Sequence, residues 1–562
     1  MGRLSRRTFV GGVGAAGAVA ATGYLGTASA ATASLLDDRM ASGSAWSSFL
    51  SSQDLIWKRI PTNWYDGPFL GNGFLGALLY QPGGTGPLQL LLGHTEVQDH
   101  RPALGPLFGL SRLPVGHLSL HTAGTVQAVN LRLSLWNAEL TGTVTTSKGS
   151  IGLSVFVHDQ QPVLVATLTP DAGEAGAAWT FAPDEAVSPR ADPRWNKPIP
   201  VAGGETVTAW QHSGSTLYLS IAHSFPDNGA RSAAIGAVQS AVGAGVTSLR
   251  ASHRKGWHAF YPKSFFSFPD ARLQSFYWIQ LYKFNCVTRG NAPILATMGP
   301  WVTTTPWPAV WYDGNVQTEY WLLQTANHRE LDSCTNSFAV PANQQNLINQ
   351  VPAKYRSDSA ALWRESDRFL ASGGVVPVPG TTPPPPWETT TGMEIGDLSY
   401  ALSNVYLTYR HTMDDAMARS TLFPLLRRAV NYYLHFLTTG SDGKLHLPAT
   451  YLPESDYEPD NDYDLPLLRW GCRTLLELNA RLKLGDSKAG KWQQVLDKLT
   501  GDGRTTLGAY PLFLVTIDQG ADAHAYVDSI VDGWQSDVAN WNGFHTAHIA
   551  SVAAAPRRRW RR

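Results

Sequence analysis

The residues best suited to chemistry lie together in residues 311–321, Trp-Tyr-Asp-Gly-Asn-Val-Gln-Thr-Glu-Tyr-Trp. Buried amides and carboxylates each need hydrogen-bond partners, so few protein cores favour this mixture. A sugar-binding cleft does favour it, because apolar sugar faces stack on aromatic rings while sugar hydroxyls bond to amides and carboxylates. The stretch therefore predicts a carbohydrate site in which Trp311, Glu319 and Trp321 contact the substrate. The alternative is an amphipathic helix start that happens to be rich in aromatic residues.

A second stretch with chemical potential is residues 446–457, His-Leu-Pro-Ala-Thr-Tyr-Leu-Pro-Glu-Ser-Asp-Tyr. Glu454 follows Tyr451, Leu452 and Pro453, an apolar setting that favours the protonated form of a carboxyl group. Such a group can donate a proton near neutrality, and Tyr451 beside it could contact a sugar. A solvated acidic loop is the alternative, because more carboxylates follow, at positions 458, 460 and 462.

Composition narrows the possible functions. The 562 residues suggest two or more domains, and the formal net charge of +0 argues against a nucleic-acid partner. Charged residues make up 16%, below the usual level of about 25%, so other polar residues must cover much of the surface. Cys286, Cys334 and Cys472 are widely separated and have no metal-ligand spacing, so we expect core thiols, with neither a metal nor an organic cofactor.

The N-terminus has the features of a targeting segment. Arg6-Arg7 precedes a weakly hydrophobic Gly/Ala run, and Ala28-Ser29-Ala30 offers small residues for cleavage. We expect residues 1–30 to be a twin-arginine signal peptide and the protein to be secreted already folded. The run is too short and too rich in glycine for a stable membrane anchor.

Residues 45–249 are expected to form an antiparallel β-sandwich. Leucine and valine alternate with polar residues along 129–136, and the pattern recurs in 153–157, 164–168 and 217–221, separated by turn-forming residues. Near the start lies Pro68–Ala77, where three glycines surround Asn72. These glycines allow close backbone approach or positive φ, and we expect Asn72 to contact the substrate.

From Asp270 onward the pattern becomes helical. Asp270 is a suitable N-cap, and residues 398–409, 422–436 and 468–482 carry apolar side chains at helical spacing. Helices in antiparallel pairs, joined by alternating short and long loops, indicate a helical toroid over residues 270–555. Residues 250–269 have no period and are expected to be the interdomain linker.

Three of these segments, in this order, resemble glycoside hydrolase family 95, whose known members include α-L-fucosidases. Residues 68–77 resemble the family's Pro-x-Gly-Asn-Gly-x-Leu-Gly-Ala pattern with one extra residue, and residues 452–455 resemble its Ser-Pro-Glu-Asn loop. Residues 315–321 resemble its Asn-x-Asn-x-Glu pattern followed closely by Tyr-Trp, with Gln317 at the second amide. The resemblance covers nearly all of the chain after the signal segment, although it is divergent. It implies a β-sandwich followed by an (α/α)6 barrel.

The resemblance also implies an inverting hydrolysis of α-linked fucose or a related sugar in an oligosaccharide or polysaccharide. Glu454 would protonate the departing glycosidic oxygen, while Asn315 and Gln317 would hold the attacking water. Inverting sites need about 6.5–9.5 Å between the acid and base groups to admit that water. Gln317 is one methylene longer than the family's asparagine, which could shift the water, alter the preferred sugar or abolish the chemistry.

The general base is the main departure from the family. Its Asp-Gly-Asn-Phe-Gly segment has no counterpart after Glu454, and after Ala555 the sequence continues as Pro-Arg-Arg-Arg-Trp-Arg-Arg. We therefore expect a toroid that is incomplete at its C-terminus, with a tail, residues 556–562, from a shifted reading frame. A tail that binds polyanions is the rival interpretation. Asp313 is the alternative base if it faces the same cleft as Asn315; otherwise it orients the loop.

Two other functions remain open. A carbohydrate-binding relative with weak catalysis is favoured by Gln317 and by the missing aspartate. A polysaccharide lyase is the third hypothesis, since some lyases combine a helical toroid with a β-sandwich. The sandwich-first order counts against the lyase, and the appearance of an unsaturated uronic acid would identify it. Neither the linkage nor the oligomeric state follows from the sequence.

Overall fold

The structure, a computed structural model, describes residues 40–100, 110–186, 204–302, 305, 308–372, 374–381, 394–453, 455–501, 508, 512, 514 and 520–541. Residues 1–52 and 53–562 form two compact units. The described part of the first unit contains the helix α3 (Gly43–Ser51), which Ser42 caps by accepting a hydrogen bond from the amide of Ala45. The predicted signal peptide and basic tail lie outside the described residues.

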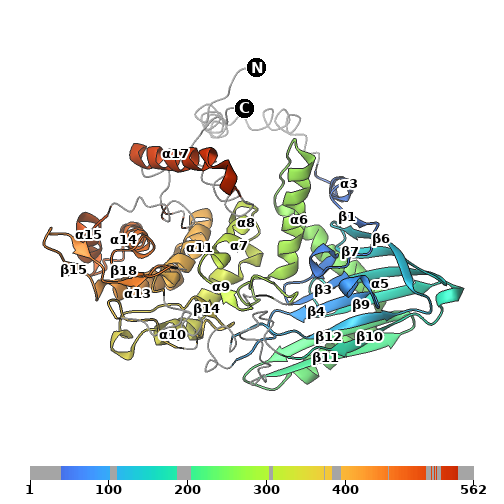
Figure 1. The fold of residues 1–562 in the computed structure, drawn as a ribbon. Coiled ribbons are helices and arrows are strands. Elements are labelled where there is room, and N and C mark those ends of the chain that lie inside the picture. Colours follow the sequence, from blue (N-terminus) through green and yellow to red (C-terminus); the bar gives the residue numbers. More distant parts are fainter. Residues whose placement is uncertain are drawn as a thin grey trace, which may run out of the picture. The chain divides into compact units, whose positions relative to one another are not determined.

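The second unit begins with two antiparallel sheets (Figure 1). The seven-stranded sheet has the order β1 (Leu55–Trp57), β6 (Val126–Ser134), β7 (Glu139–Thr146), β8 (Gly149–Val157), β9 (Leu164–Pro170), β12 (Thr216–Ser224), β11 (Glu205–Ser213). The five-stranded sheet has the order β10 (Ala178–Pro183), β5 (Gly116–His121), β4 (Gln89–His94), β3 (Leu75–Tyr80), β2 (Phe69–Gly71). The sheets contact each other where β2 and β3 meet β8 and where β4 meets β12.

The alternating pattern explains why these segments are strands. In β6, Leu131 and Leu133 are fully buried, whereas Asn130 and Arg132 are exposed. Burying each leucine contributes about 1.5–3 kcal/mol, and a shift of register by one residue would expose both. The predicted antiparallel β-sandwich is therefore confirmed, and three of the four predicted strand runs lie within strands, whereas the run 129–136 extends two residues beyond the end of β6.

The structure corrects the predicted boundary between the two regions. Residues 230–260, expected to end the sandwich and to begin the linker, instead form the helical segment α5 (Ala230–Phe260), which is kinked at Gly245, where φ is +75°. It packs on β11 and β12, where Val238, Ala241 and Leu249 share a core with strand residues Phe156 and Tyr218. The sequence does not reveal this helix clearly because many of its residues are alanine or glycine. Such small side chains give little contrast in hydrophobicity between the buried and the exposed face. By length and composition α5, extended to Lys263, would also suffice to cross a membrane, alone among the described helices.

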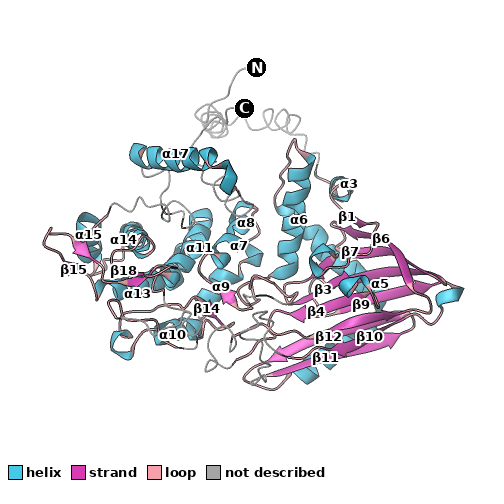
Figure 2. Cartoon of the chain, viewed as in Figure 1, coloured by secondary structure: helices cyan, strands magenta, loops and turns pink. Residues whose placement is uncertain are grey.

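A helical region follows the sheets, as predicted (Figure 2). Its longer described helices are α6 (Ala271–Val287), α9 (Ser333–Ala339), α10 (Pro341–Asn349), α11 (Asp397–Thr412), α13 (Phe423–Leu434), α14 (Asp464–Arg481), α15 (Ala489–Lys498) and α17 (Ala521–Ser536). The short helices are α7 (Asn315–Glu319), α8 (Trp321–Thr325) and α12 (Asp415–Met417). Asp270 caps α6 as expected, accepting from the amides of Arg272 and Leu273. The three cysteines are buried and free, which confirms the core thiols.

The described helices make up part of the expected toroid. Helix α11 contacts α7, α8, α9, α13 and α14, and α14 also contacts α15. Their apolar stripes face inward: Leu398, Leu402 and Val405 of α11 are fully buried. Among these neighbours, α7 carries the predicted site residues Asn315, Gln317 and Glu319.

The turn between β2 and β3 joins the sheet to the helical region. Asn72 donates to the backbone oxygens of His158 and Gln161 at 3.0 and 3.1 Å, and its Oδ1 accepts from the amides of Phe74 and Leu75. The next residue, Gly73, has a φ of +88° and donates to the carbonyl of Cys286 at 2.8 Å. The glycine prediction is confirmed here, because a Cβ on Gly71 would lie 2.4 Å from that same carbonyl oxygen.

Because Asn72 bonds only to the backbone, we expect Asn72→Ala to reduce the free energy of unfolding. The substitution leaves buried backbone groups without partners, so the expected loss is about 2–4 kcal/mol. Urea unfolding would measure the loss. Asn63→Ala, at an exposed position in the same unit, is the control and should change stability by less than about 0.5 kcal/mol. An equal effect in both variants would contradict this structural role.

Candidate active site

A short strand pair holds the aromatic stretch in place. Strand β13 (Val310–Trp311) pairs antiparallel with β14 (Glu365–Ser366), and Tyr312 donates its amide to the carbonyl of Arg364 at 2.7 Å. The hydroxyl of Tyr312 also lies 2.8 Å from that of Ser366. This pairing brings Asp313 beside Arg364, although 51 positions separate them in the sequence (364 − 313).

Arg364 is the centre of a buried charge cluster. Its Nε lies 3.4 Å from Oδ2 of Asp313, and its Nη2 forms an ion pair with Glu394. Burial alone would lower the pKa of Arg364, but the charges of Asp313, Glu365 and Asp397 raise it above its usual value. We call Arg364, Asp313, Glu365, Glu394 and Asp397 the Arg364 cluster.

The Arg364 cluster contains four carboxyl groups and one guanidinium group. Asp397, the first residue of α11, is fully buried. Burial raises the pKa of Asp397 well above its usual value and the charge of Asp313 adds to this, while the hydroxyl of Tyr463, which donates to Asp397, opposes it. Asp313 is ion-paired to Arg364, whereas the pKa of Asp397 is raised. Neighbouring carboxyl groups in such different environments are a common feature of acid–base sites.

The hairpin formed by β17 (Thr450–Tyr451) and β18 (Tyr457–Glu458) lies next to the cluster. The guanidinium carbon of Arg364 is 5.8 Å from the centre of the Tyr451 ring, within cation–π range. Thr450 donates to Asp464 at 2.5 Å and accepts from Asn461 at 2.7 Å, which fixes the base of the hairpin. Glu454 belongs to the segment between these strands and lies outside the described residues.

The buried Asp464 that anchors this hairpin gives a testable pH dependence. Burial raises the pKa of Asp464 from its usual value of 3.8 to about 6. The native state therefore holds this proton more tightly, so the contribution of Asp464 to stability is complete below about pH 4 and is lost as pH rises through about 6. The stability of the parent relative to Asp464→Asn should fall by on the order of 3 kcal/mol across this range.

Urea unfolding of both proteins at several pH values measures that difference. Asp462→Asn changes an exposed neighbour and is the control. A difference between parent and Asp464→Asn that does not vary with pH would contradict the assignment.

Gln317 has a different environment from the one expected for a water-holding residue. Its Oε1 accepts from the amide of Gly314 at 3.1 Å, and its Nε2 donates to the carbonyl of Tyr312 at 2.7 Å. The side chain is fully buried and fixes the start of α7. Asn315, the first residue of α7, is partly exposed, and its carbonyl accepts from the hydroxyl of Thr318 at 3.1 Å. Its side-chain amide forms no hydrogen bond within the described part of the chain and remains available to other partners.

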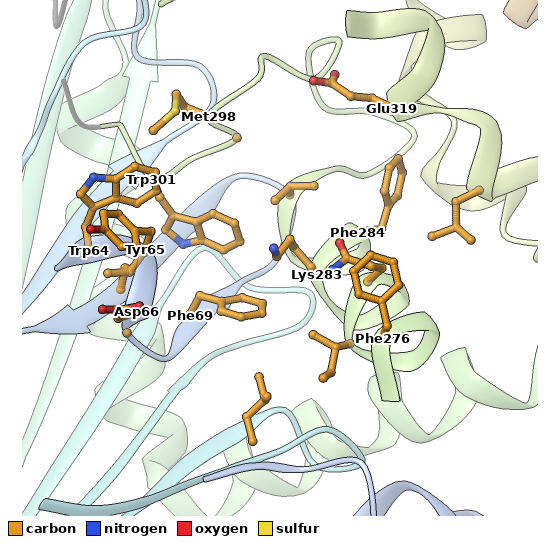
Figure 3. A pocket seen from close by; sticks show the side chains of 18 of the residues that line it. Trp64, Tyr65, Asp66, Phe69, Phe276, Lys283, Phe284, Met298, Trp301 and Glu319 are labelled. Atoms are coloured by element: carbon orange, nitrogen blue, oxygen red, sulfur yellow. The ribbon is translucent and has the colours of Figure 1, made fainter. Parts of the chain in front are cut away.

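The structure separates the remaining predicted substrate contacts. Trp311 is 6% exposed and lies within β13, and Trp321, partly buried, begins α8. The side-chain amide of Asn72 holds the backbone turn described above, and the residue also lines a pocket with Phe74 and His94, so its contact with the substrate stays a prediction. Glu319 lines a cleft beside α6 (Figure 3). Tyr451 is instead next to the Arg364 cluster.

Sequence reasoning missed Arg364, Glu394 and Asp397. A signal was present, because residues 363–367 read Trp-Arg-Glu-Ser-Asp in a chain with only 16% charged residues. Such a concentration of charges next to tryptophan is unusual for a solvated loop. Arg364 lies beside Asp313 because β13 pairs with β14. Each of these strands has only two residues, which is too short to give a recognisable strand pattern in the sequence.

A comparison with protein families agrees with the motif resemblance. Residues 288–506 match the Glycosyl hydrolase family 95 catalytic domain, and no curated protein matches the chain significantly. A solved structure described as a kojibiose phosphorylase from the human microbiome has a TM-score of 0.49 and 12% identity, over 77% of this chain and 66% of that chain. A bacterial glucoamylase complexed with acarbose has a TM-score of 0.40 and 10% identity, over 79% and 69%. This chain thus spans about two thirds of the length of each.

The matched range includes the whole Arg364 cluster, α7 and the hairpin of Tyr451. The resemblance is confirmed over this range, which contains two of the three motifs, residues 315–321 and 452–455. Residues 288–506, which carry the candidate site, therefore have the sequence characteristics of a glycoside hydrolase catalytic domain of family 95.

Proposed function

We propose that this protein is an inverting glycoside hydrolase that removes α-linked fucose or a related sugar from oligosaccharides or polysaccharides. The observation that carries the proposal is the position of Asp313. It is ion-paired to Arg364, whose guanidinium also faces Tyr451 at the base of the hairpin that includes Glu454. Asp313 and Tyr451, which precedes Glu454 by three residues in the sequence, thus lie on the same guanidinium within the matched range.

In the proposed reaction Glu454 donates its proton to the departing glycosidic oxygen as the bond to the anomeric carbon breaks. The oxygen of a water molecule attacks the opposite face of that carbon, and Asp313 accepts the proton that the water loses. Asn315 orients the water through its side-chain amide, one residue beyond Gly314. The two carboxyl groups need about 6.5–9.5 Å between them for a water to fit. Both carboxyl groups return to their starting states when the product leaves and protons exchange with solvent.

We also propose that the protein is exported in the folded state. The twin arginine, the Gly/Ala run and the small residues at 28–30 support this, in that order along the chain. Three buried thiols that are not paired with one another are compatible with folding in a reducing compartment before export.

A carbohydrate-binding protein with weak catalysis is the second candidate, and one observation favours it. Both ends of the Gln317 amide already bond to the backbone of the α7 start, so this residue has less capacity to orient water than a solvent-facing asparagine. In that case the aromatic and carboxyl groups would bind sugar without efficient turnover.

The anomeric form of the released sugar tests the proposal. Proton NMR during hydrolysis of an α-fucoside should show the β-anomer first, because inversion requires direct attack by water. Asp313→Asn should reduce turnover while sugar binding, measured by calorimetry, persists. Initial release of the α-anomer, or full activity of Asp313→Asn, would reject the mechanism. Binding without release would favour the second candidate, and absorbance from an unsaturated uronic acid would identify a lyase.

A further inference from the structure

A large cleft lies between α6 and the chain segment from β1 to β2. Its volume is about 1130 Å³, which is slightly above the usual range for small-molecule sites, roughly 300–1,000 Å³. The segment opposite α6 includes the short helix η1 (Trp64–Asp66). Figure 3 shows the aromatic side chains of Trp64, Tyr65, Phe69, Trp301, Phe276 and Phe284 around this space.

The apolar walls of this cleft are open to solvent. Tyr65 is 67% exposed and Phe276 is 63% exposed, and the neighbouring Ile56 and Leu273 are also exposed. Exposed apolar surface is unfavourable by roughly 25 cal/mol per Å² relative to burial. A contiguous patch of this kind usually marks a binding site.

One cation projects into this apolar space. Figure 3 shows Lys283 of α6 between Phe69 and Trp301 on one side and Phe276 and Phe284 on the other. Its Nζ lies 5.2 Å from the centre of the Phe69 ring, and it forms no ion pair within the described part of the chain. Burial lowers the pKa of Lys283, as expected for an ammonium group without a carboxylate partner. A bound anion would compensate this charge.

Glu319 adds a polar group at another edge of the cleft (Figure 3). Burial raises the pKa of Glu319 well above its usual value, and its Oε2 has no hydrogen-bond partner in the described part of the chain. This shift favours the neutral carboxyl group, which can hydrogen-bond to a ligand without repelling an anion.

We propose that this cleft binds a planar apolar molecule that carries one anionic group, such as an aromatic acid. Its ring system packs among the aromatic side chains, and its anion pairs with Nζ of Lys283. Aliphatic residues such as Leu55, Leu273 and Ile279 line much of the cleft, which suits an apolar ring better than a hydroxyl-rich sugar. The site is separate from the Arg364 cluster, and it does not depend on the proposed hydrolysis.

A fluorescence titration of the full chain with two matched probes tests the proposal. Naphthalene sulfonate carries the anion, whereas naphthalene methanol is neutral and of similar shape. We expect the sulfonate to bind at least about 10-fold more tightly, which corresponds to about 1.4 kcal/mol. Lys283→Met should abolish this preference and leave the affinity for naphthalene methanol within about two-fold, because methionine retains the apolar stem.

Phe276→Gln should lower the affinity for both probes, because it removes an aromatic ring from the wall of the cleft. Phe276 is exposed, so the substitution is not expected to unfold the protein. Lys255→Met, at an exposed position on α5, is the control and should leave both affinities unchanged. Equal affinities for the two probes, or no effect of Lys283→Met, would overturn the proposal. So would a concentration-dependent dimer, detected by light scattering, that Phe276→Gln dissociates, since a second copy would then occupy the cleft. Binding is measured without turnover, so an inactive protein would not affect the result.

Discussion

Glu454→Gln is expected to lower kcat by about 100- to 10,000-fold on glycosides with poor leaving groups, the usual range for losing a general acid. Glutamine has the same shape but cannot supply the proton that the departing oxygen needs. A dinitrophenyl leaving group departs without such help, so the loss on a dinitrophenyl glycoside should be much smaller. Steady-state kinetics on a matched pair of alkyl and dinitrophenyl glycosides measures both values.

Glu458→Gln is the matched control for this experiment. Glu458 is exposed on β18 of the same hairpin, so its substitution should leave both rates unchanged. If Glu454→Gln lowers the rates on the two glycosides equally, the residue positions the substrate and does not donate the proton. If it lowers neither, the acid is another residue.

Arg364→Met is expected to have the largest effect on stability. The guanidinium is buried between Glu394 and Asp313, and its removal leaves these carboxylates without their cation. Breaking a buried ion pair from one side costs about 3–5 kcal/mol, because the remaining charge stays desolvated. Urea unfolding at neutral pH measures the loss. Arg481→Met removes an exposed arginine paired with Asp415 and should cost no more than about 1 kcal/mol.

A double substitution distinguishes charge from packing at this position. Adding Glu394→Gln to Arg364→Met removes one of the stranded carboxylates, so it should restore part of the lost stability. Replacing both members of a buried pair is usually far less costly than replacing one. No recovery in the double variant would indicate that Arg364 acts mainly through its apolar stem.

The sequence was sufficient to predict elements whose pattern of side chains is local, such as an alternation along a strand or a helix cap. Alternating leucines in 129–135 predicted β6, because a strand exposes every second side chain to one face. Asp270 predicted the start of α6, because its carboxylate accepts the otherwise unpaired amides of the first turn. Helix α5 was missed since alanine and glycine carry its period, and small residues produce little contrast between a buried and an exposed face.

The candidate site was predicted in part from the sequence, and the rest of it is evident only in the structure. The aromatic, amide-rich composition of 311–321 indicated a sugar site, and the order of the three motifs indicated the family that residues 288–506 match. Composition does not indicate which atoms of a side chain remain free to bind a ligand after the protein has folded. Gln317 and Asn72 were predicted to serve ligands, yet their amides bond to backbone groups, because an ordered turn requires partners for its own amides and carbonyls.

The sequence by itself therefore determined the order of sheets and helices, the cap of α6 and the resemblance of the catalytic region. Only the tertiary structure showed that Asp313, Glu394 and Asp397 meet at Arg364, and that Glu319 lines a separate cleft with Lys283. The physical reason is the range of the interactions. Periodicity and capping act over a few residues, whereas ion pairs and cavity walls join residues that the chain brings together only on folding.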